Sequence, residues 1–429
     1  MQKPKGTYDL YGNDGKQVKE IEKLINALME QYNYEYIRTP HFEASELFHR
    51  GVGETTDIVS KETYDFKDRG DRLMTLRPEG TAGVVRSYVE NKMYGEFSPR
   101  KLWYYGPMYR YERPQSGRFR EFYQFGIEVF GADSALMDAE VISIPVNLYR
   151  LLGLKDIKVN INTLGDVDVR LKYKEALMDY FRPHLGELCS DCKERFNKNP
   201  LRILDCKVDH NLDIMKNAPI ITDYLNEESK KHYEELKKSL DMLKIDYVEN
   251  PKLVRGLDYY THTVFEVEAN VEGFGSQNVL CGGGRYDFLV KQLGGPNTPA
   301  VGFAMGMERL IEALKYENIN LVNDDNIDIY VIPIDTKEYS LALTNDLRMN
   351  GFRTEMDYMN RKLDKNFKQA DRLGSKLIII VGEEEVNTNI LTIKDNHTKE
   401  SYKVKLEDVI DFLDEKLNEE CECGCNHED

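Results

Sequence analysis

Four arginines lie close together in the stretch MYRYERPQSGRFREFYQFG at residues 108–126, although the chain as a whole carries a formal net charge of -17. Guanidinium groups bind carboxylates and phosphates through paired hydrogen bonds. A local excess of them in an acidic chain therefore indicates an anionic ligand, because local basic patches, not net charge, determine phosphate contacts. The four residues are Arg110, Arg113, Arg118 and Arg120.

The two halves of this stretch place polar side chains on one face of a predicted β-hairpin. Side chains two residues apart on a strand share a face, so Arg110 and Glu112 point the same way, as do Gln124 and Glu128 on the returning strand. Such a face is poorly suited to a hydrophobic core. It is either a solvated face with ion pairs or a ligand site, and aromatic residues on both strands favour the ligand site.

The segment TLRPEGTAG at residues 75–83 brings a carboxylate, a close backbone approach and a hydroxyl together at Glu79, Gly80 and Thr81. This combination suits an ammonium group. The alternative interpretation is an ordinary Pro-Glu-Gly turn that precedes a helix.

The segment LVRGLDYYTHTVFE provides Arg255 and two adjacent tyrosines, Tyr259 and Tyr260. We expect strand structure over residues 253–269. Adjacent side chains on a strand face opposite sides, so only one of the two tyrosines is expected to line a pocket. Core tyrosines with a solvated hydroxyl are the alternative.

Glycines mark two further segments. In VGFAMGMERL, Gly302 and Gly306 allow a strand and a helix to approach each other, and Arg309 follows where the helix is expected to begin. The segment CGGGRYD at 281–287 predicts a glycine-rich turn. It is neither a Walker loop, because no Gly-Lys-Ser/Thr follows, nor a dinucleotide-binding fingerprint.

A mixed framework of helices and strands is needed to position these residues. Apolar residues at helical spacing predict an amphipathic helix over 15–33, and a second helix is expected near 134–152. Segments 101–111 and 121–131 predict the antiparallel hairpin, joined by a Pro-Gln-Ser-Gly loop. Residues 167–250 are rich in Lys and Glu and predict an inserted helical module.

A polar linker at 320–326 precedes a segment of different character. Beyond it, strand-like and helix-like segments alternate, which predicts a compact α/β domain of about a hundred residues with parallel strands. The final nine residues, CECGCNHED, predict a solvated tail.

Composition excludes several classes of protein. With 41% hydrophobic and 31% charged residues among 429, the chain can bury a core, which argues against wholesale disorder. No apolar run approaches the ~18 residues of a membrane-spanning helix, and the amino terminus lacks the apolar core of a signal peptide. Seven cysteines, an odd number, fit a reducing compartment. We therefore expect a cytoplasmic protein.

Three cysteines and a histidine have the spacing C-x2-C-x13-C-x3-H at Cys189, Cys192, Cys206 and His210, which is compatible with tetrahedral zinc. Three reduced thiols in a helical module are the alternative, and we favour it over a metal site. The tail at 421–429 also carries cysteine and histidine, but its acidic residues favour a disordered segment.

In their order along the chain, TLRPEGTAG, MYRYERPQSGRFREF, LVRGLDYYTHTVFE, CGGGRYD and GFAMGMERL resemble the motifs of class II aminoacyl-tRNA synthetases. RGLDYY and GGGRYD resemble the blocks that distinguish the histidyl-tRNA synthetase family, and the likeness covers nearly the whole chain. It implies an α+β fold. The implied parts are a catalytic domain on an antiparallel sheet (1–325) with a helical insertion at about 167–250, an α/β anticodon-binding domain (326–420) and a tail (421–429).

The resemblance implies a two-step reaction. The carboxylate of L-histidine attacks the α-phosphate of ATP and releases pyrophosphate, and the terminal ribose hydroxyl of tRNA(His) then attacks the histidyl-adenylate. Two guanidiniums across the forming adenylate would favour the transition state, which makes Arg110 and Arg255 the implied catalytic residues. Magnesium is expected on the β- and γ-phosphates.

The same resemblance implies an ATP site. Arg110 would grip the α-phosphate, and Arg118 would meet the γ-phosphate. Phe122 would stack on adenine while Glu112 takes its amino group. Arg309 would close on the nucleotide from the other side.

The implied histidine site holds the ammonium group with Glu79 and Thr81 and reads the two imidazole nitrogens with Glu128 and Tyr260. A buried site that hydrogen-bonds both nitrogens can discriminate by ~10⁴ or better, so no editing site is expected. The full implied set is Glu79, Gly80, Thr81, Arg110, Gln124, Glu128, Arg255, Tyr259 and Tyr260.

The resemblance also implies partners. Arg113 and Gln115 would meet the tRNA acceptor end, and Pro40 in YIRTPHFE resembles a dimer-interface motif, so a homodimer is expected. One alternative is a histidine-sensing regulatory subunit of ATP phosphoribosyltransferase, which shares the catalytic fold without its activity. The presence of residues 327–418 counts against it. Another is a class II synthetase for glycine, proline or threonine, against which the RGLDYY block counts.

Overall fold

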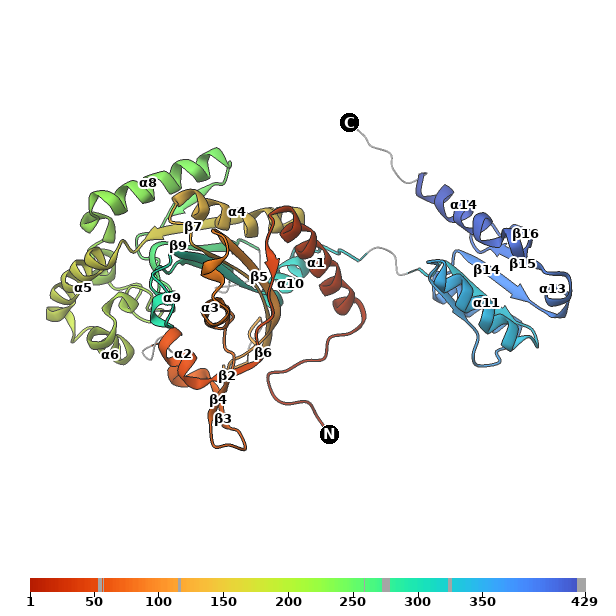
Figure 1. Ribbon diagram of the computed structural model, residues 1–429, viewed down its shortest axis with the longest axis horizontal. Helices are drawn as coiled ribbons and strands as arrows, with labels where there is room; N and C mark the ends of the chain where they lie inside the picture. Colours follow the sequence, from red (N-terminus) through yellow and green to blue (C-terminus); the bar gives the residue numbers. More distant parts are fainter. Residues whose placement is uncertain are drawn as a thin grey trace. The chain divides into compact units, whose positions relative to one another are not determined.

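The computed structural model describes residues 1–52, 56, 58–114, 117–257, 259–271, 278–322 and 326–422. The chain folds into two compact units, Met1–Leu321 and Val322–Asp429 (Figure 1). Within the described ranges, no helix is both long enough and apolar enough to cross a membrane.

A large sheet forms the centre of the first unit. In the part of the chain that the structure describes, it has eight strands in the order β1-β5-β6-β11-β10-β9-β7-β8. Its neighbours are antiparallel except at the two edges, where β1 pairs with β5 and β8 with β7 in parallel. The strands are β1 (Glu35–Tyr36), β5 (Arg100–Tyr109), β6 (Glu121–Phe130), β7 (Ile157–Thr163), β8 (Tyr247–Glu249), β9 (Thr261–Ala269), β10 (Val279–Arg285) and β11 (Ala300–Gly306).

Helices and a small sheet surround this large sheet (Figure 1). The small sheet, as described, has the order β2-β4-β3, with β2 (Phe42–Ala44), β3 (Tyr64–Lys67) and β4 (Leu73–Leu76). The helices are α1 (Gly12–Gln31), α2 (Ser45–Val52), α3 (Thr81–Glu90), α4 (Ala135–Leu151), α5 (Val167–Phe181), α6 (Ser190–Lys198), α7 (Asp213–Lys216), α8 (Glu227–Met242), α9 (Leu289–Gln292) and α10 (Met307–Tyr316).

The predicted hairpin is confirmed. β5 and β6 pair in antiparallel register from Arg100 opposite Phe130 to Tyr109 opposite Glu121. Arg110 lies just beyond the end of β5, where its backbone N–H still donates to the Arg120 carbonyl at 2.9 Å. The hairpin therefore holds the arginine-rich loop at the end of two central strands.

Apolar periodicity explains how the helices pack on this sheet. In α1, Ile21, Ile25 and Leu28 recur at helical spacing and are buried in one core with residues of α4. The helix expected near 134–152 is confirmed as α4, with Pro145 inside it. Its start is capped by Ser134, whose hydroxyl accepts the Leu136 N–H at 3.2 Å.

Two strand-level expectations were wrong. Residues 253–260 are not part of a strand, because β9 begins only at Thr261. The glycine run is not a turn but lies within β10, between β9 and β11. Its glycines serve close approach, since a Cβ at Gly282 would overlap the Arg255 guanidinium and a Cβ at Gly283 would overlap the β11 backbone.

The second unit has its own core and sheet. Over residues 326–422 the sheet order is β13-β12-β14-β15-β16, and only the first three strands are mutually parallel. The expected parallel α/β pattern therefore holds for the first half, and an antiparallel pair completes the sheet. The elements are β12 (Ile329–Pro333), α11 (Lys337–Met349), β13 (Thr354–Met356), α12 (Leu363–Arg372), β14 (Leu377–Val381), α13 (Glu383–Thr388), β15 (Ile390–Asp395), β16 (Ser401–Lys405) and α14 (Val409–Glu422).

The tail predicted at 421–429 lies largely outside the described residues, which end at 422.

Candidate active site

A cavity of about 510 Å³ opens in the first unit and gathers side chains from segments far apart in the sequence. Most of the residues singled out from the sequence line it, including both arginines named as catalytic. Those lining residues are Glu79, Thr81, Arg110, Glu112, Arg118, Phe122, Gln124, Arg255, Tyr259, Tyr260 and Arg309.

Four of the singled-out residues are placed differently. Glu128 is fully buried, and Gly80 packs against the ring of Tyr104, so neither lines the cavity. Arg113 is exposed and lies outside the cavity lining. Gln115 lies outside the described residues.

Glu79 sits at the start of α3, where its carboxylate accepts the backbone N–H groups of Thr81 (2.9 Å) and Ala82 (2.8 Å). These first-turn donors have no partner inside the helix, so a carboxylate there caps it. Burial raises the pKa of Glu79 in spite of these bonds. The turn before α3 therefore holds an acidic group in the cavity wall.

Glu128 on β6 is the centre of a hydroxyl cluster. Thr81 donates to its Oε1 at 2.7 Å, Tyr104 to the same oxygen at 3.4 Å, and Tyr286 to Oε2. Burial raises the pKa of Glu128 to about 8. A Cβ at Gly302 would overlap this carboxylate, so glycine on β11 provides its space.

At the arginine-rich end of the cavity, a backbone carbonyl, a carboxylate and an aromatic ring hold the arginine side chains in place. Arg110 Nε donates to the Pro78 carbonyl at 2.8 Å, and its guanidinium lies 5.2 Å from the centre of the Phe122 ring. Glu112 accepts from Arg118 at 3.2 Å and lies 3.8 Å from Arg110. The two guanidiniums thus converge on one carboxylate and leave donors for a further anion.

Arg255 enters the same cavity from the segment before β9. It pairs with Glu266 on β9 and lies over the Tyr260 ring at 6.0 Å. Burial alone would lower the pKa of Arg255, but Glu266 raises it above the ordinary value. No group of the described chain accepts a hydrogen bond from the buried Nε of its guanidinium.

Arg309 is held at the start of α10 by the Val279 carbonyl, 2.8 Å from its Nη1. Burial and the neighbouring Arg118 lower the pKa of Arg309. Cations placed this close to one another are stabilised by a shared anion.

Both tyrosines of the RGLDYY segment line the cavity, which corrects the expectation that only one would. Their ring centroids are 4.7 Å apart. The alternation that separates neighbouring side chains applies only within a strand, and Tyr259 and Tyr260 precede β9.

Comparisons with known proteins agree with this geometry. A sequence model of the family described as histidyl-tRNA synthetase matches residues 6–310, and one described as anticodon binding domain matches residues 328–416. The chain belongs to the histidyl-tRNA synthetase family. The family resemblance inferred from the sequence motifs is thereby confirmed.

Individual relatives of the histidyl-tRNA synthetase family cover nearly the whole chain. A histidine–tRNA ligase of Bacillus cytotoxicus is 51% identical over 97% of this chain and 99% of its own, and one of Macrococcus caseolyticus is 49% identical over 96% and 98%. The crystal structure of apo Staphylococcus aureus histidyl-tRNA synthetase is similar with a TM-score of 0.83, at 43% identity over 96% of this chain and 99% of that one.

Three residues of this histidyl-tRNA synthetase site were missed in the sequence: Tyr104, Glu266 and Tyr286. Tyr286 stands in the quoted GGGRYD block, which was the available signal. Glu266 is the last residue of the quoted segment LVRGLDYYTHTVFE, which was the signal for it. Nothing in the sequence singles out Tyr104, which lies on a strand among several similar residues.

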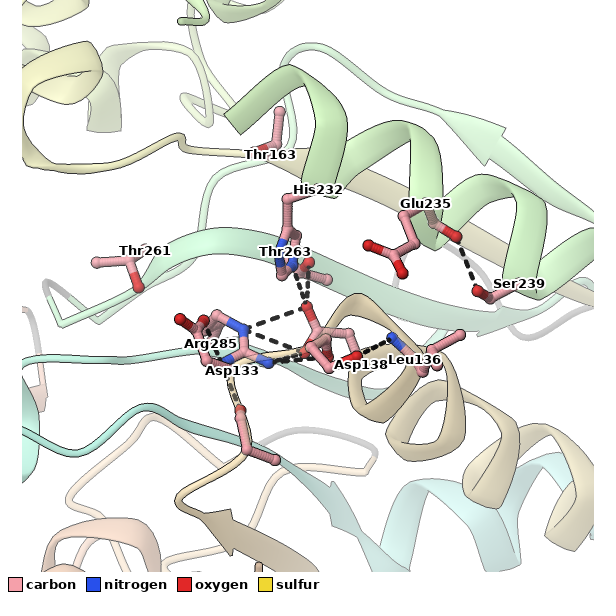
Figure 2. A network of polar contacts seen from close by, with 12 residues as sticks. Asp133, Leu136, Asp138, Thr163, His232, Glu235, Ser239, Thr261, Thr263 and Arg285 are labelled. Atoms are coloured by element: carbon pink, nitrogen blue, oxygen red, sulfur yellow. Dashed lines mark hydrogen bonds and ion pairs between the residues drawn. The ribbon is translucent and has the colours of Figure 1, made fainter. Parts of the chain in front are cut away.

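A buried ion-pair network joins β10, one residue before the cavity-lining Tyr286, to α4 and α8 (Figure 2). Arg285 on β10 pairs with Asp138 on α4, and both side chains are fully buried. His232 of α8 lies 2.8 Å from the same carboxylate, and Thr263 of β9 donates to it at 2.6 Å. Burial would raise the pKa of Asp138, but Arg285 lowers it well below its usual range.

We expect Arg285→Ala to lower the free energy of unfolding by about 3–5 kcal/mol, because the Asp138 carboxylate is left buried without its counter-ion. Urea unfolding at fixed protein concentration, followed by the fluorescence of Trp103, the chain's single tryptophan, reports on the first unit. The matched control is Arg72→Ala, whose side chain is 80% exposed in its pair with Asp68 and should cost at most about 1 kcal/mol. Equal losses in the two variants would contradict the prediction.

Proposed function

We propose that this chain is a histidine–tRNA ligase that joins L-histidine to ATP, releasing pyrophosphate, and then transfers the histidyl group to the 3′ end of tRNA(His). One observation supports this proposal above the others. A single cavity combines a guanidinium-rich end with an end built from buried carboxylates and hydroxyls. The first end suits a triphosphate, and the second suits a small molecule with an ammonium group and two ring nitrogens.

At the nucleotide end, Arg110 and Arg255 act on the α-phosphate from two sides. Charge develops on this phosphate in the transition state, and preorganised cations in a partly dry cavity stabilise it without reorganising at that moment. Arg118 and Arg309 hold the rest of the triphosphate. Phe122, already in contact with Arg110, offers a face on which adenine can stack.

At the histidine end, Glu79 and Thr81 bind the ammonium group. Gln124 lies in the cavity wall, and no described residue donates to its buried Oε1. We place the imidazole against Tyr260, with Glu128 acting on it through the hydroxyl groups that bind its carboxyl. Two of the hydroxyls bound to Glu128, those of Thr81 and Tyr286, line the cavity and connect that buried carboxylate to the substrate.

Magnesium fits the carboxylates of this cavity. Asp205, Glu266 and Glu308 line it in addition to the acidic residues already named. Mg²⁺ binds through one or two carboxylates, substrate phosphates and retained waters. When bound with ATP it would neutralise charge on the β- and γ-phosphates, while the arginines of the chain orient the α-phosphate.

We divide the chain into a catalytic domain at 1–325, with a helical insertion at about 167–250, and an anticodon-binding domain at 326–420. The second of these domains would contact the anticodon. The match of residues 328–416 to an anticodon-binding family supports this division. Arg113 would meet the acceptor end of the tRNA, and its exposure on the loop after β5 supports this role. We place the protein in the cytoplasm, where aminoacylation supplies translation.

The regulatory-subunit alternative is weaker. A Bacillus halodurans structure titled ATP phosphoribosyltransferase regulatory subunit/histidyl-tRNA synthetase shares the fold, with a TM-score of 0.62, but only 23% of its sequence. The present chain keeps the anticodon-binding segment and all four arginines of the nucleotide end.

Pyrophosphate exchange into ATP, measured with each of the twenty amino acids in turn, tests the proposal. Exchange should depend on histidine, and histidine should then be esterified to tRNA(His). Exchange that depends on another amino acid, or histidine binding without any exchange, would overturn it.

We also propose that the protein is a homodimer built on the Pro40 segment. Tyr36, Phe42 and Phe66 are all more than 40% exposed and surround that segment, and β1 is an edge strand of the large sheet. Exposed apolar groups beside a free strand edge are typical of an interface. Light scattering at micromolar concentration should give twice the chain mass, and Phe42→Glu should shift it towards a single chain. A single-chain mass for the unaltered protein would contradict the proposal.

A further inference from the structure

Three cysteines and an aspartate of the inserted helical module meet at one point. One ligand atom from each of Cys189, Cys192, Cys206 and Asp209 lies within 4.8 Å of all the others. Cys192, Cys206 and Asp209 are at most 4% exposed. The expected fourth member, His210, is exposed and directs its Nδ1 to the Lys207 carbonyl at 2.7 Å. Asp209, the residue before His210, therefore takes the fourth position that was expected for the histidine.

The spacing of these atoms matches a tetrahedral metal site. Two thiolates that each lie about 2.3 Å from one zinc ion stand about 3.8 Å apart. The Cys189 and Cys206 sulfur atoms are 3.7 Å apart, and both cysteines are free thiols. Carboxylate oxygen is an accepted fourth ligand for zinc beside sulfur.

The charge at this point also lacks a cation. Asp209 accepts the Cys189 N–H with both oxygens, at 3.1 and 3.3 Å, and no basic side chain of the described residues forms an ion pair with it. A divalent cation would neutralise this buried carboxylate beside three thiols, two of which are buried, since buried charges are paired or coordinate metals.

The backbone around the cluster supports the ligands from outside. Cys189 occupies the N-cap position of α6 without a side-chain capping bond, and Cys192 lies in the first turn of that helix. The Asp209 N–H donates to the Cys206 sulfur at 3.4 Å, which would orient that sulfur as a ligand.

We propose that Cys189, Cys192, Cys206 and Asp209 bind one zinc ion, which ties the segment at 202–207 to α6. This segment borders the catalytic cavity. Asp205 and Lys207, on either side of Cys206, line that cavity, and Arg202 donates to the Gly256 carbonyl at 3.1 Å, next to Arg255. The ion would therefore stabilise one wall of the cavity from behind. The inference does not depend on the proposed substrate.

Metal content of the full chain tests the inference. The tail offers competing ligands, so the starting protein should carry Cys421→Ser, Cys423→Ser, Cys425→Ser and His427→Ala. We expect this protein, purified without chelator and supplied with zinc, to contain about one zinc ion per chain when measured by elemental mass spectrometry. After exchange with cobalt it should show thiolate-to-cobalt charge-transfer absorption.

Further substitutions in that protein identify the ligands. Cys192→Ser and Asp209→Asn should lose most of the zinc. The matched controls His210→Ala and Cys281→Ser, which alter a neighbouring side chain and a buried thiol outside the cluster, should retain it. Zinc lost with His210→Ala and kept with Asp209→Asn would overturn the ligand set.

Two results on the otherwise unaltered module would overturn the inference even if its variants do not fold. One is the absence of both zinc and cobalt–thiolate absorption in the starting protein. The other is a disulfide between Cys189 and Cys206 in protein purified from a reducing cytoplasm, detected by mass spectrometry without reductant.

Discussion

Arg255→Ala is expected to lower kcat/KM for histidine-dependent pyrophosphate exchange by about 10² or more. That is the scale on which a preorganised group aimed at developing charge contributes to catalysis. Arg255 is partly buried and pairs with Glu266, which holds its side chain in the cavity wall. The loss should fall mainly on kcat, since the charge is greatest in the transition state.

The variant Arg255→Ala also leaves the partly buried Glu266 without its counter-ion, and this second effect can be separated from the first. Glu266→Gln combined with Arg255→Ala removes the unpaired carboxylate. If Arg255 acts on the phosphate, the double variant stays as inactive as the single one. Recovery of exchange in the double variant would show that Arg255 serves only to neutralise Glu266. Arg72→Ala, an exposed arginine elsewhere in the first unit, is the control for loss of positive charge.

Glu128→Gln is expected to raise KM for histidine by about tenfold to a hundredfold. Leaving a buried hydrogen-bonding group without its partner costs about 1–3 kcal/mol, which covers that range. Three hydroxyls donate to the Glu128 carboxylate, and an amide offers two N–H donors in place of one of its acceptor oxygens. KM for ATP should change little, because Glu128 lies away from the arginine-rich end.

Glu112→Gln is the reciprocal control for this second prediction. It makes the same chemical change at the nucleotide end, where Glu112 accepts from Arg118 and lies near Arg110. We expect it to raise KM for ATP and to leave KM for histidine nearly unchanged. A Glu128→Gln variant that raises both constants equally, or neither, would show that Glu128 has a structural role alone.

Local pattern sufficed for much of the framework. Helical spacing of apolar residues predicted α1 and α4, and the turn residues between two aromatic-rich segments predicted the β5–β6 hairpin. These features depend on neighbours a few residues apart, and such neighbours are already adjacent in the chain. The order of the motifs then identified the family, because each motif is a short stretch whose residue types can be read without knowing its tertiary neighbours.

Local pattern failed where the environment of a residue comes from distant segments. The glycine run at 282–284 has the composition of a turn, but it pairs with β9 and β11 as a central strand. Glycine is needed there because Arg255 and the β11 backbone leave no room for a Cβ. Tyr259 and Tyr260 share a cavity because the chain there is not a strand.

The amino-acid sequence by itself determined the helices, the hairpin, the family and most of the side chains that meet in the cavity. Tertiary structure alone decided their partners: Tyr286 and Tyr104 for Glu128, Glu266 for Arg255, and Asp209 in place of His210 beside the three cysteines. The physical reason is the sequence separation over which each kind of interaction acts. Backbone periodicity acts over a few residues, whereas ion pairs and buried hydrogen bonds depend on which strands become neighbours and in what register.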